Sequence, residues 1–281
     1  MAGVASTPAR GQWAVMTFDL GSLDPRYSTI LCDLWGVVHD GFRLIDGAGD
    51  RLARWAGEGR CVILITNAPR TADAVRAQLD ALGLQRGHYR GIATGGQAGI
   101  DALLGRERVG FLGTSADRAD MERAGLRFMA EGFRDLCCVG LDGQRHAVAD
   151  YVEEFERSAR AEVLLHCLNP DRVVIHGGVE ELCAGALADA YEELGGRVCW
   201  YGKPYPAIYD HALALAGRPR REQVLAIGDG LVTDVLGAAR QGLDCLFVSG
   251  GIHRGQPFPA DFAHRHGLGE WAPLGIVECL R

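Results

Sequence analysis

Residues 28–41 read STILCDLWGVVHDG and contain the first indication of an enzyme. The apolar run at the start of this stretch predicts a buried strand, which ends at the acidic residue Asp33. A carboxylate at the end of a buried strand costs free energy unless a metal ion, a charged partner or a reaction keeps it there. A turn with Gly36 and a polar pair, His39 and Asp40, follows at once. The stretch therefore predicts a strand that delivers a reactive carboxylate to a turn.

Short apolar runs of the same kind recur along the chain and alternate with helical patterns. Their nearly continuous hydrophobicity is typical of strands that are covered on both faces, as in parallel sheets. The runs are STILCD, CVILITN, RVGFLG, DLCCVG, AEVLLHCL, RVCWYG, QVLAIGD and DCLFVSGG. Because strands that alternate with helices form α/β folds, we predict an α/β protein.

Three segments between these runs have the pattern of helices. Residues 71–83 carry apolar residues at helical spacing and end at Gly83, as many helices do. Residues 206–217 begin with a proline, which the first turn of a helix tolerates. Residues 180–196 predict a further helix that ends at Gly195. Its apolar face is expected to contain Leu182, Ala186, Ala190 and Leu194.

The composition is that of a globular protein and disfavours several classes of partner. The chain has 281 residues, 48% of them apolar, which is enough for a buried core. Its net charge of −7 disfavours nucleic acid and anionic membranes as partners. No apolar stretch reaches the roughly 18 residues that span a bilayer, and residues 1–12 predict a loose tail. Nine scattered cysteines without a C-x-x-C motif predict reduced thiols, and hence a cytoplasmic protein.

Polar residues follow several of the predicted strands, at the carboxyl ends where open α/β sheets bind their ligands. These residues are Asp33, Thr66, Asn67, Lys203, Asp229 and Asp234. A carboxylate can attack phosphorus, a hydroxyl and an amide can hold phosphoryl oxygens, and an ammonium can neutralise their charge. Paired carboxylates suit Mg²⁺, which prefers oxygen ligands. Together these groups predict a site for phosphoryl transfer.

The order and spacing of these residues resemble the haloacid dehalogenase superfamily. Asp33 matches the first motif of that family, Thr66 the second, Lys203 the third, and GDGLVTD (residues 228–234) the fourth. Roughly 135 residues separate Thr66 from Lys203, too many for a simple connection in a compact core. Further segments resemble the class II branch with a large C2 cap (class IIA): LNPD (168–171), CAGAL (183–187) and GKPYPAIY (202–209).

The resemblance, which covers about residues 28–250, implies a doubly wound parallel-sheet core with an inserted α/β C2 cap. Residues 1–104 are expected to form the first core segment and residues 105–198 the cap. Residues 199–281 are expected to return to the core.

The activity implied by the resemblance is that of a magnesium-dependent hydrolase, a phosphatase that acts through an aspartyl-phosphate intermediate. Asp33 is then the nucleophile, Thr66 and the Asn67 amide grip the phosphoryl oxygens, and Lys203 offsets their charge. The implied Mg²⁺ ligands are Asp33, the backbone carbonyl of Trp35, Asp229 and Asp234. The expected partner is a small phosphorylated metabolite, and a homodimer is one possible assembly.

Trp35 departs from the family pattern. Phosphatases of the superfamily carry a second aspartate two residues after the nucleophile, which protonates the leaving oxygen and then activates water. An indole donates one hydrogen bond but exchanges no proton near neutral pH. General acid–base assistance is typically worth ~10²–10⁴ in rate, so its loss is serious without abolishing turnover.

Several interpretations of this departure remain open. His39 lies in the following turn and titrates in the right range to supply the proton. It is also a candidate to contact the substrate, although a packed or surface turn histidine is the more ordinary role. A leaving group that departs easily would need little protonation. Alternatively, the chain has lost catalysis and serves as a phosphate-ligand binding or regulatory protein. A metal-free dehalogenase fits poorly, because the acidic fourth motif would then have no ion to hold.

Two segments outside the four motifs are candidates for substrate contact. VVIHGG (residues 173–178) suits a loop lowered over the site, and His176 is expected to touch substrate, with a structural turn histidine as the alternative. ATGGQAG (residues 93–99) resembles a phosphate-binding loop, which by itself is a weak signal.

Overall fold

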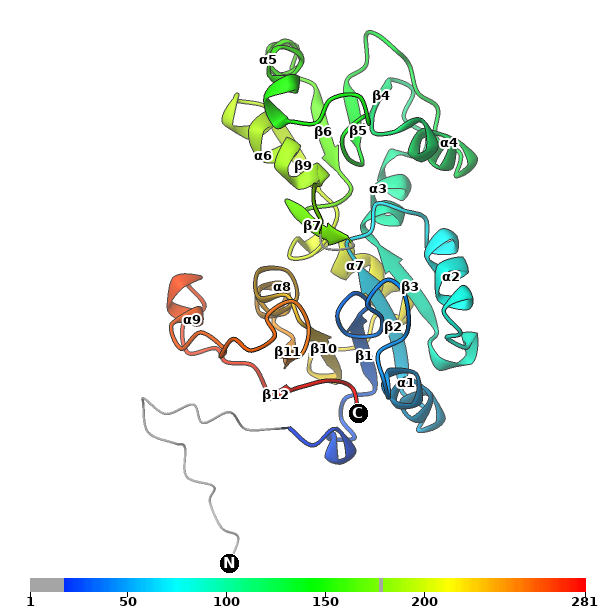
Figure 1. Cartoon of the computed structure of the whole chain (residues 1–281), viewed down its shortest axis with the longest axis vertical. Coiled ribbons are helices and arrows are strands. Elements are labelled where there is room, and N and C mark those ends of the chain that lie inside the picture. The colour runs from blue at the N-terminus through cyan, green and yellow to red at the C-terminus, as the bar shows by residue number, and fades with distance from the viewer. Residues whose placement is uncertain (1–17, 177–178) are drawn as a thin grey trace, which may run out of the picture.

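The computed structural model describes residues 18–176 and 179–281, which form two parallel sheets and one hairpin (Figure 1). The larger sheet, the core sheet, has six parallel strands in the order β12-β11-β10-β1-β2-β3. These strands are β1 (Thr29–Asp33), β2 (Cys61–Thr66), β3 (Gly91–Thr94), β10 (Val224–Gly228), β11 (Asp244–Val248) and β12 (Gly275–Val277). The winding direction reverses between β1 and β10, which is where doubly wound sheets open a crevice for ligands.

Helices cover both faces of the core sheet. On one face lie α1 (Ala48–Gly57) and α2 (Ala72–Ala81), and on the other α7 (Pro206–Leu215) and α8 (Leu236–Arg240). Successive residues of a strand point to opposite faces, so Ile30 packs in the cluster of α1 and α2 and Leu31 in that of α7 and α8. This double coverage explains why β1 is buried along its whole length.

The second sheet, the cap sheet, has four parallel strands in the order β4-β5-β6-β9. They are β4 (Val109–Leu112), β5 (Asp135–Cys138), β6 (Leu164–Cys167) and β9 (Arg197–Trp200). The cap sheet packs against α3 (Gly95–Leu103) and α4 (Ser115–Arg123) on one face, and against α5 (Val152–Arg160) and α6 (Ala184–Glu193) on the other. It lies beyond the carboxyl ends of the core strands (Figure 1). The predicted α/β class, a doubly wound parallel core with a cap, is confirmed.

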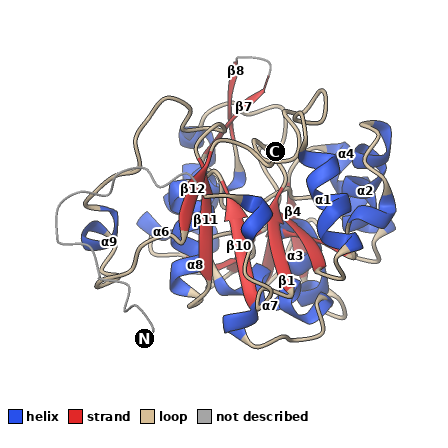
Figure 2. Cartoon of the chain, turned by 90° about the horizontal axis from the view of Figure 1, so that it is seen from below, coloured by secondary structure: helices blue, strands red, loops and turns tan. Residues whose placement is uncertain are grey.

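A two-stranded antiparallel hairpin corrects one sequence prediction. It consists of β7 (Val173–His176) and β8 (Val179–Leu182), and it stands out from the rest of the molecule in Figure 2. The expected helix over residues 180–196 therefore begins only at Ala184. Its buried face contains Ala184, Leu187, Ala188 and Tyr191 instead of the predicted set. The prediction failed because Leu182 has helical spacing to Ala186, yet Leu182 pairs with Val173 in the hairpin.

The remaining elements are short. They are α9 (Phe262–Arg265), the π-helical turn η5 (Leu231–Val235), and the 3-10 turns η1 (Leu20–Ser22), η2 (Arg86–His88), η3 (Val148–Tyr151) and η4 (Arg221–Gln223). All nine cysteines carry free thiols, most of them inside strands or against them. Among the described residues, no helix has the length and apolarity to cross a membrane. The predicted loose tail, residues 1–12, lies outside the described residues.

Candidate active site at the carboxyl ends of the core strands

The predicted site residues meet at the point where the strand order reverses. Asp33 is the last residue of β1, Thr66 is the last residue of β2, and Asp229 directly follows β10. β1 pairs with both β2 and β10, so these three strand ends are neighbours. The structure brings together around one cavity Asp33, Trp35, Thr66, Asn67, Lys203, Asp229 and Asp234.

The turn after Asp33 is shaped by its sequence. The backbone N–H groups of Val38 and His39 donate to the carbonyl of Leu34 at 2.8 and 3.0 Å, while the side chain of Val38 is buried in the core. Gly36 has a φ of +77°, and a Cβ atom there would lie 2.1 Å from Oδ2 of Asp229. Only glycine therefore lets this turn pass so close to Asp229.

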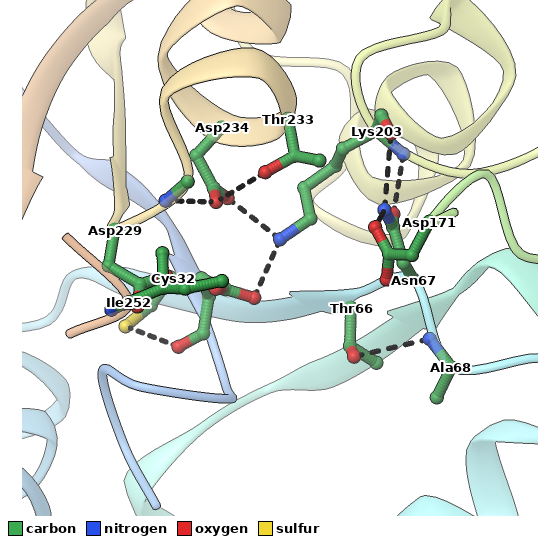
Figure 3. Close-up of polar contacts among 12 residues, drawn as sticks. Cys32, Thr66, Asn67, Ala68, Asp171, Lys203, Asp229, Thr233, Asp234 and Ile252 are labelled. Atoms are coloured by element: carbon green, nitrogen blue, oxygen red, sulfur yellow. Dashed lines mark hydrogen bonds and ion pairs between the residues drawn. The ribbon is translucent and has the colours of Figure 1, made fainter. Parts of the chain in front are cut away.

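Lys203 joins two of the buried carboxylates. Its Nζ donates to Oδ1 of Asp234 at 2.7 Å (Figure 3) and to Oδ1 of Asp33 at 2.6 Å. All three side chains are almost fully buried. Asp229 lies beside them and accepts from the backbone N–H of Ile252 at 2.7 Å. Lys203 is the only lysine in the chain, in which every other basic side chain apart from histidine is arginine. The ammonium of lysine is a compact point charge with three donors, which here serve two carboxylates at once.

The carboxylates of this cluster are difficult to ionise together. Burial, and next the charge of Asp234, raise the pKa of Asp33 well above its usual range, although Lys203 opposes them. Burial and Asp234 likewise raise the pKa of Asp229 to about 6. For Lys203, burial lowers the pKa, but the two carboxylates that face it raise it above its ordinary value. The cluster thus has an excess of negative charge that its single ammonium does not balance.

That excess of charge fits a divalent cation. Asp33, Asp229 and Asp234 each offer a carboxylate oxygen, and these atoms lie within 4.8 Å of one another. Three carboxylates and one ammonium leave two negative charges, which a Mg²⁺ ion would neutralise. Buried charges require such compensation, and carboxylate oxygens are ligands that Mg²⁺ prefers. The donor set is therefore suitable for the predicted ion.

The side chain of Asn67 holds the backbone of Lys203, whereas the sequence predicted that the Asn67 amide grips phosphoryl oxygens. Its Oδ1 accepts from the backbone N–H of Lys203 at 2.6 Å. Its Nδ2 donates to the carbonyl of Lys203 at 3.1 Å and to Oδ1 of Asp171 at 2.8 Å (Figure 3). The side-chain amide is thus committed to holding Lys203, and what remains for a phosphoryl oxygen is the backbone N–H. Asp171, to which the sequence assigned no role, orients this amide.

Thr66 remains suited to its predicted role. Its Oγ1 accepts from the backbone N–H of Ala68 at 3.3 Å, and the residue lines the cavity. Because a hydroxyl both accepts and donates, this contact fixes Oγ1 while its hydrogen can still be donated to a ligand.

His39 does not line the cavity, contrary to the expectation that it contacts substrate. It is buried, its Nδ1 accepts from the backbone N–H of Gly41 at 3.0 Å, and its ring meets that of Trp35 edge to face at 5.4 Å. Burial lowers the pKa of His39, although Asp40 opposes this. The sequence could not reveal this burial, because a histidine in a turn is as often exposed. His39 is a support for Trp35.

The cavity has a volume of about 1430 Å³, which is large for a small ester. Its walls include residues that the sequence did not suggest. Gly251 and Ile252 come from the loop after β11, and Arg172 and Val173 from the cap segment before and within β7. The sequence could have suggested the first pair, because DCLFVSGG predicts a core strand whose carboxyl end lies at the same edge of the sheet as the other site residues.

Two other candidates remain, one of which the structure does not describe. The side chain of His176 lies outside the part of the chain that the structure describes, so its contact with substrate remains a prediction. The glycine-rich stretch ATGGQAG forms the end of β3 and the start of α3 and does not line the cavity. A Cβ atom at Gly95 would lie 2.2 Å from the carbonyl of Leu168, and one at Gly96 2.3 Å from the backbone of Arg70. These glycines permit close packing of the backbone at both positions.

Comparison with known proteins agrees with this geometry. A family model described as haloacid dehalogenase-like hydrolase matches residues 30–127, and one described as HAD-hydrolase-like matches residues 200–267. The chain is similar to a crystal structure of a hydrolase of the haloacid dehalogenase-like family from Brucella suis 1330. The two are 34% identical with a TM-score of 0.77, over 93% of this chain and 98% of that one. The chain belongs to the haloacid dehalogenase-like family.

Further members of this family are similar over most of the chain. Chronophin from Bos taurus is 28% identical over 81% of this chain and 82% of its own length. Glycerol phosphate phosphatase from Mycobacterium tuberculosis, solved in complex with magnesium, is 26% identical with a TM-score of 0.70. That match covers 91% of this chain and 76% of the other. The two family-model matches flank residues 128–199, which contain most of the cap sheet.

Proposed function

We propose that this protein is a Mg²⁺-dependent phosphatase that hydrolyses a small phosphate monoester through a phosphorylated Asp33. The observation that carries the proposal is the buried cluster of Asp33, Asp229 and Asp234 around Lys203. A carboxylate next to an ammonium and a site for a divalent cation is what attack on a dianionic phosphoryl group requires. The names of relatives such as glycerol phosphate phosphatase support this class of substrate.

Asp33, Asp229 and Asp234 would hold the ion, together with the carbonyl of Trp35. When bound, Mg²⁺ supplies charge that draws the phosphoryl group toward Asp33 and stabilises the oxygens of the transition state. The residues of the chain do the rest. Lys203 and the hydroxyl of Thr66 contact phosphoryl oxygens, and the Asn67 side chain keeps the backbone of Lys203 in place.

The reaction proceeds in two steps. An oxygen of Asp33 forms a bond to phosphorus while the bond to the ester oxygen breaks, and that oxygen leaves with the electron pair. Water then attacks the phosphorus of the aspartyl phosphate, which releases inorganic phosphate and restores Asp33. Because Trp35 transfers no proton, the leaving oxygen must take its proton from solvent or depart without one.

We propose that residues 105–198 form the cap domain that covers this site, and that residues 1–104 and 199–281 form the core. The separate cap sheet and the hairpin residues Val173 and Val174 in the cavity wall support a division into cap and core. The last cap strand, β9 (Arg197–Trp200), extends two residues beyond the proposed boundary at 198, and α3 (Gly95–Leu103) packs on the cap sheet although it precedes residue 105. Hydrogen exchange should then reveal two protected units that open separately, one for each sheet.

A screen of phosphate monoesters with wild type and Asp33→Asn tests the proposed function. Wild type should release phosphate in the presence of millimolar Mg²⁺, and Asp33→Asn should lower the rate by on the order of 10⁴-fold or more. Activity that is equal in the two proteins would refute Asp33 as the nucleophile. A phosphate-binding protein without turnover is the second candidate, favoured by Trp35 alone, and saturable binding without phosphate release would establish it.

A further inference from the structure

Trp35 lines the cavity close to the carboxylate that the proposed reaction phosphorylates. Asp33 is at the buried floor of the cavity, and Trp35 follows it by two residues, so their Cα atoms are within about 7 Å. Trp35 lines the same cavity but is 38% exposed. In the proposed reaction, a phosphoryl group at Asp33 has the buried cluster on its inner side, so the rest of the ester would extend toward the exposed part of the cavity wall, which includes Trp35.

The indole is held in place by its own turn. The ring of His39 meets it edge to face with an interplanar angle of 77°, and His39 is itself fixed by the N–H of Gly41. A Cβ atom at Gly41 would lie 2.5 Å from Cη2 of Trp35, so the absence of a side chain there lets the indole lie close to the backbone. Ordered packing of this kind reduces the entropy that a ligand must remove when it binds.

Exposed apolar side chains line the cavity together with Trp35, among charged side chains such as Arg43 and Arg254. Val173 from the cap hairpin is 43% exposed, Val232 from η5 is 58% exposed, and Ile252 from the loop after β11 is 68% exposed. Exposed large apolar residues that gather at one cavity indicate a binding surface for an apolar group. They come from the core and from the cap, so a ligand between them would touch both.

We propose that Trp35 determines specificity in this protein, by stacking against phosphate monoesters whose leaving group is a flat aromatic ring. The inference rests on the proposed function, and it assigns to Trp35 a task that replaces proton transfer. An aryl ester departs as a weakly basic phenolate, which carries away the electron pair of the broken P–O bond and is protonated by water afterwards. Binding and leaving-group chemistry thus select the same class of ester.

Phosphonates separate binding from hydrolysis, because their C–P bond is not cleaved in this reaction. We would measure the affinity of phenylphosphonate and methylphosphonate for the wild-type chain by calorimetry in millimolar Mg²⁺. Phenylphosphonate should bind about 10-fold more tightly, the size expected of a stacked ring in a partly exposed site. Trp35→Ala should reduce this preference to less than about 2-fold, whereas Trp35→Phe should retain most of it.

Two further variants make the test specific. His39→Ala should weaken the preference without removing it, because the indole loses its support but remains present. Phe42→Ala removes an exposed aromatic side chain in the same segment that does not line the cavity, and it should leave both affinities unchanged.

The outcomes distinguish this inference from the proposed function. Equal affinities for the two phosphonates, no binding of either, or a preference that survives in Trp35→Ala would overturn the role of Trp35. A protein that hydrolyses esters and shows one of these results would still be a phosphatase. A protein that prefers phenylphosphonate through Trp35 but releases no phosphate from any ester would keep the binding role and lose the proposed function.

Discussion

The floor and the mouth of the cavity differ in nearly every physical property. The floor, defined by Asp33, Lys203, Asp229 and Asp234, is buried, charged and held by hydrogen bonds between segments far apart in the chain. The mouth, defined by Trp35, Val173, Val232 and Ile252, is exposed and apolar. On the proposed function, the floor supplies the groups that phosphoryl transfer needs, and the mouth selects the ester. The same proposal implies that a tryptophan at position 35, in place of a proton donor, changes the choice of substrate more than the chemistry of the floor.

Apart from the loss of Asp33 itself, the largest effect is expected from breaking the floor at Lys203. Lys203→Met leaves three buried carboxylates without their ammonium and should lower turnover by about 10²–10³-fold. Without Mg²⁺ it should also cost about 3–5 kcal/mol of unfolding free energy, as does removal of one partner from a buried ion pair. Urea unfolding and initial rates measure the two effects. Normal turnover in a folded Lys203→Met would mean that the ammonium does not serve the reaction.

Cation binding at the floor should stabilise the protein by less than the loss of Lys203 destabilises it. A ligand at 100 times its dissociation constant adds about 2.7 kcal/mol to the unfolding free energy of the protein that binds it. We expect Mg²⁺ to raise the melting temperature of the wild type and to leave that of Asp229→Ala unchanged. Ile252→Ala, in the mouth, is the matched control and should respond as the wild type does. If millimolar Mg²⁺ does not change the melting temperature of the wild type, the proposed Mg²⁺ site is wrong.

The single lysine allows the electrostatics of the floor to be observed directly. Selective labelling of lysine gives one side-chain signal, that of Lys203. Although burial lowers its pKa, Asp234 and Asp33 raise it above the ordinary value, so the folded ammonium should stay protonated as the pH passes about 10.4. Because the folded pKa is the higher one, the associated stability is present at neutral pH and is lost only as the pH rises through that value. A folded protein whose signal titrates below pH 10 would contradict the ion pairs.

The smallest effect on stability is expected at the mouth. Ile252→Ser changes an exposed side chain and should alter the unfolding free energy by no more than about 0.5 kcal/mol. It should nevertheless raise the KM for an aryl phosphate by about 2- to 3-fold and leave kcat unchanged, since the mouth contributes binding alone. The backbone N–H of Ile252, which holds Asp229, is kept in this variant. A fall in kcat with no change in KM would assign Ile252 to the floor.

The sequence was sufficient to predict the floor because each of its groups follows a strand or begins a helix in a recognisable motif. Eight predicted strands are present, and β1, β2 and β10 deliver their polar residues to one edge. The contacts of Asn67 could not be predicted in the same way. Its partners Asp171 and Lys203 lie 104 and 136 residues along the chain, and only the folded chain brings them together.

The mouth was harder to predict because its residues carry no periodic or chemical signal. In the sequence, a valine or isoleucine in a loop cannot be distinguished from an ordinary exposed residue. Only the folded structure shows that loops of the core and of the cap line one cavity. β3 and β12 were not predicted because they are short. The hairpin of β7 and β8 was not predicted because Leu182 happens to have helical spacing to the helix that follows. His39 was expected at the substrate, but burial behind Trp35 depends on packing that a local pattern does not encode.

The most direct test of the account compares leaving groups in the wild type and in Trp35→Asp. With wild type we predict a high kcat for an aryl phosphate and a much lower kcat for an alkyl phosphate, whose basic alkoxide needs a proton. Trp35→Asp restores a carboxylate and should raise kcat for the alkyl ester by about 10-fold or more. Because Trp35 is partly exposed, folding should tolerate the change, and circular dichroism with urea unfolding checks this. Equal rates on both esters in the wild type, or no gain on the alkyl ester in a folded Trp35→Asp, would contradict the claim that this position sets the choice of ester.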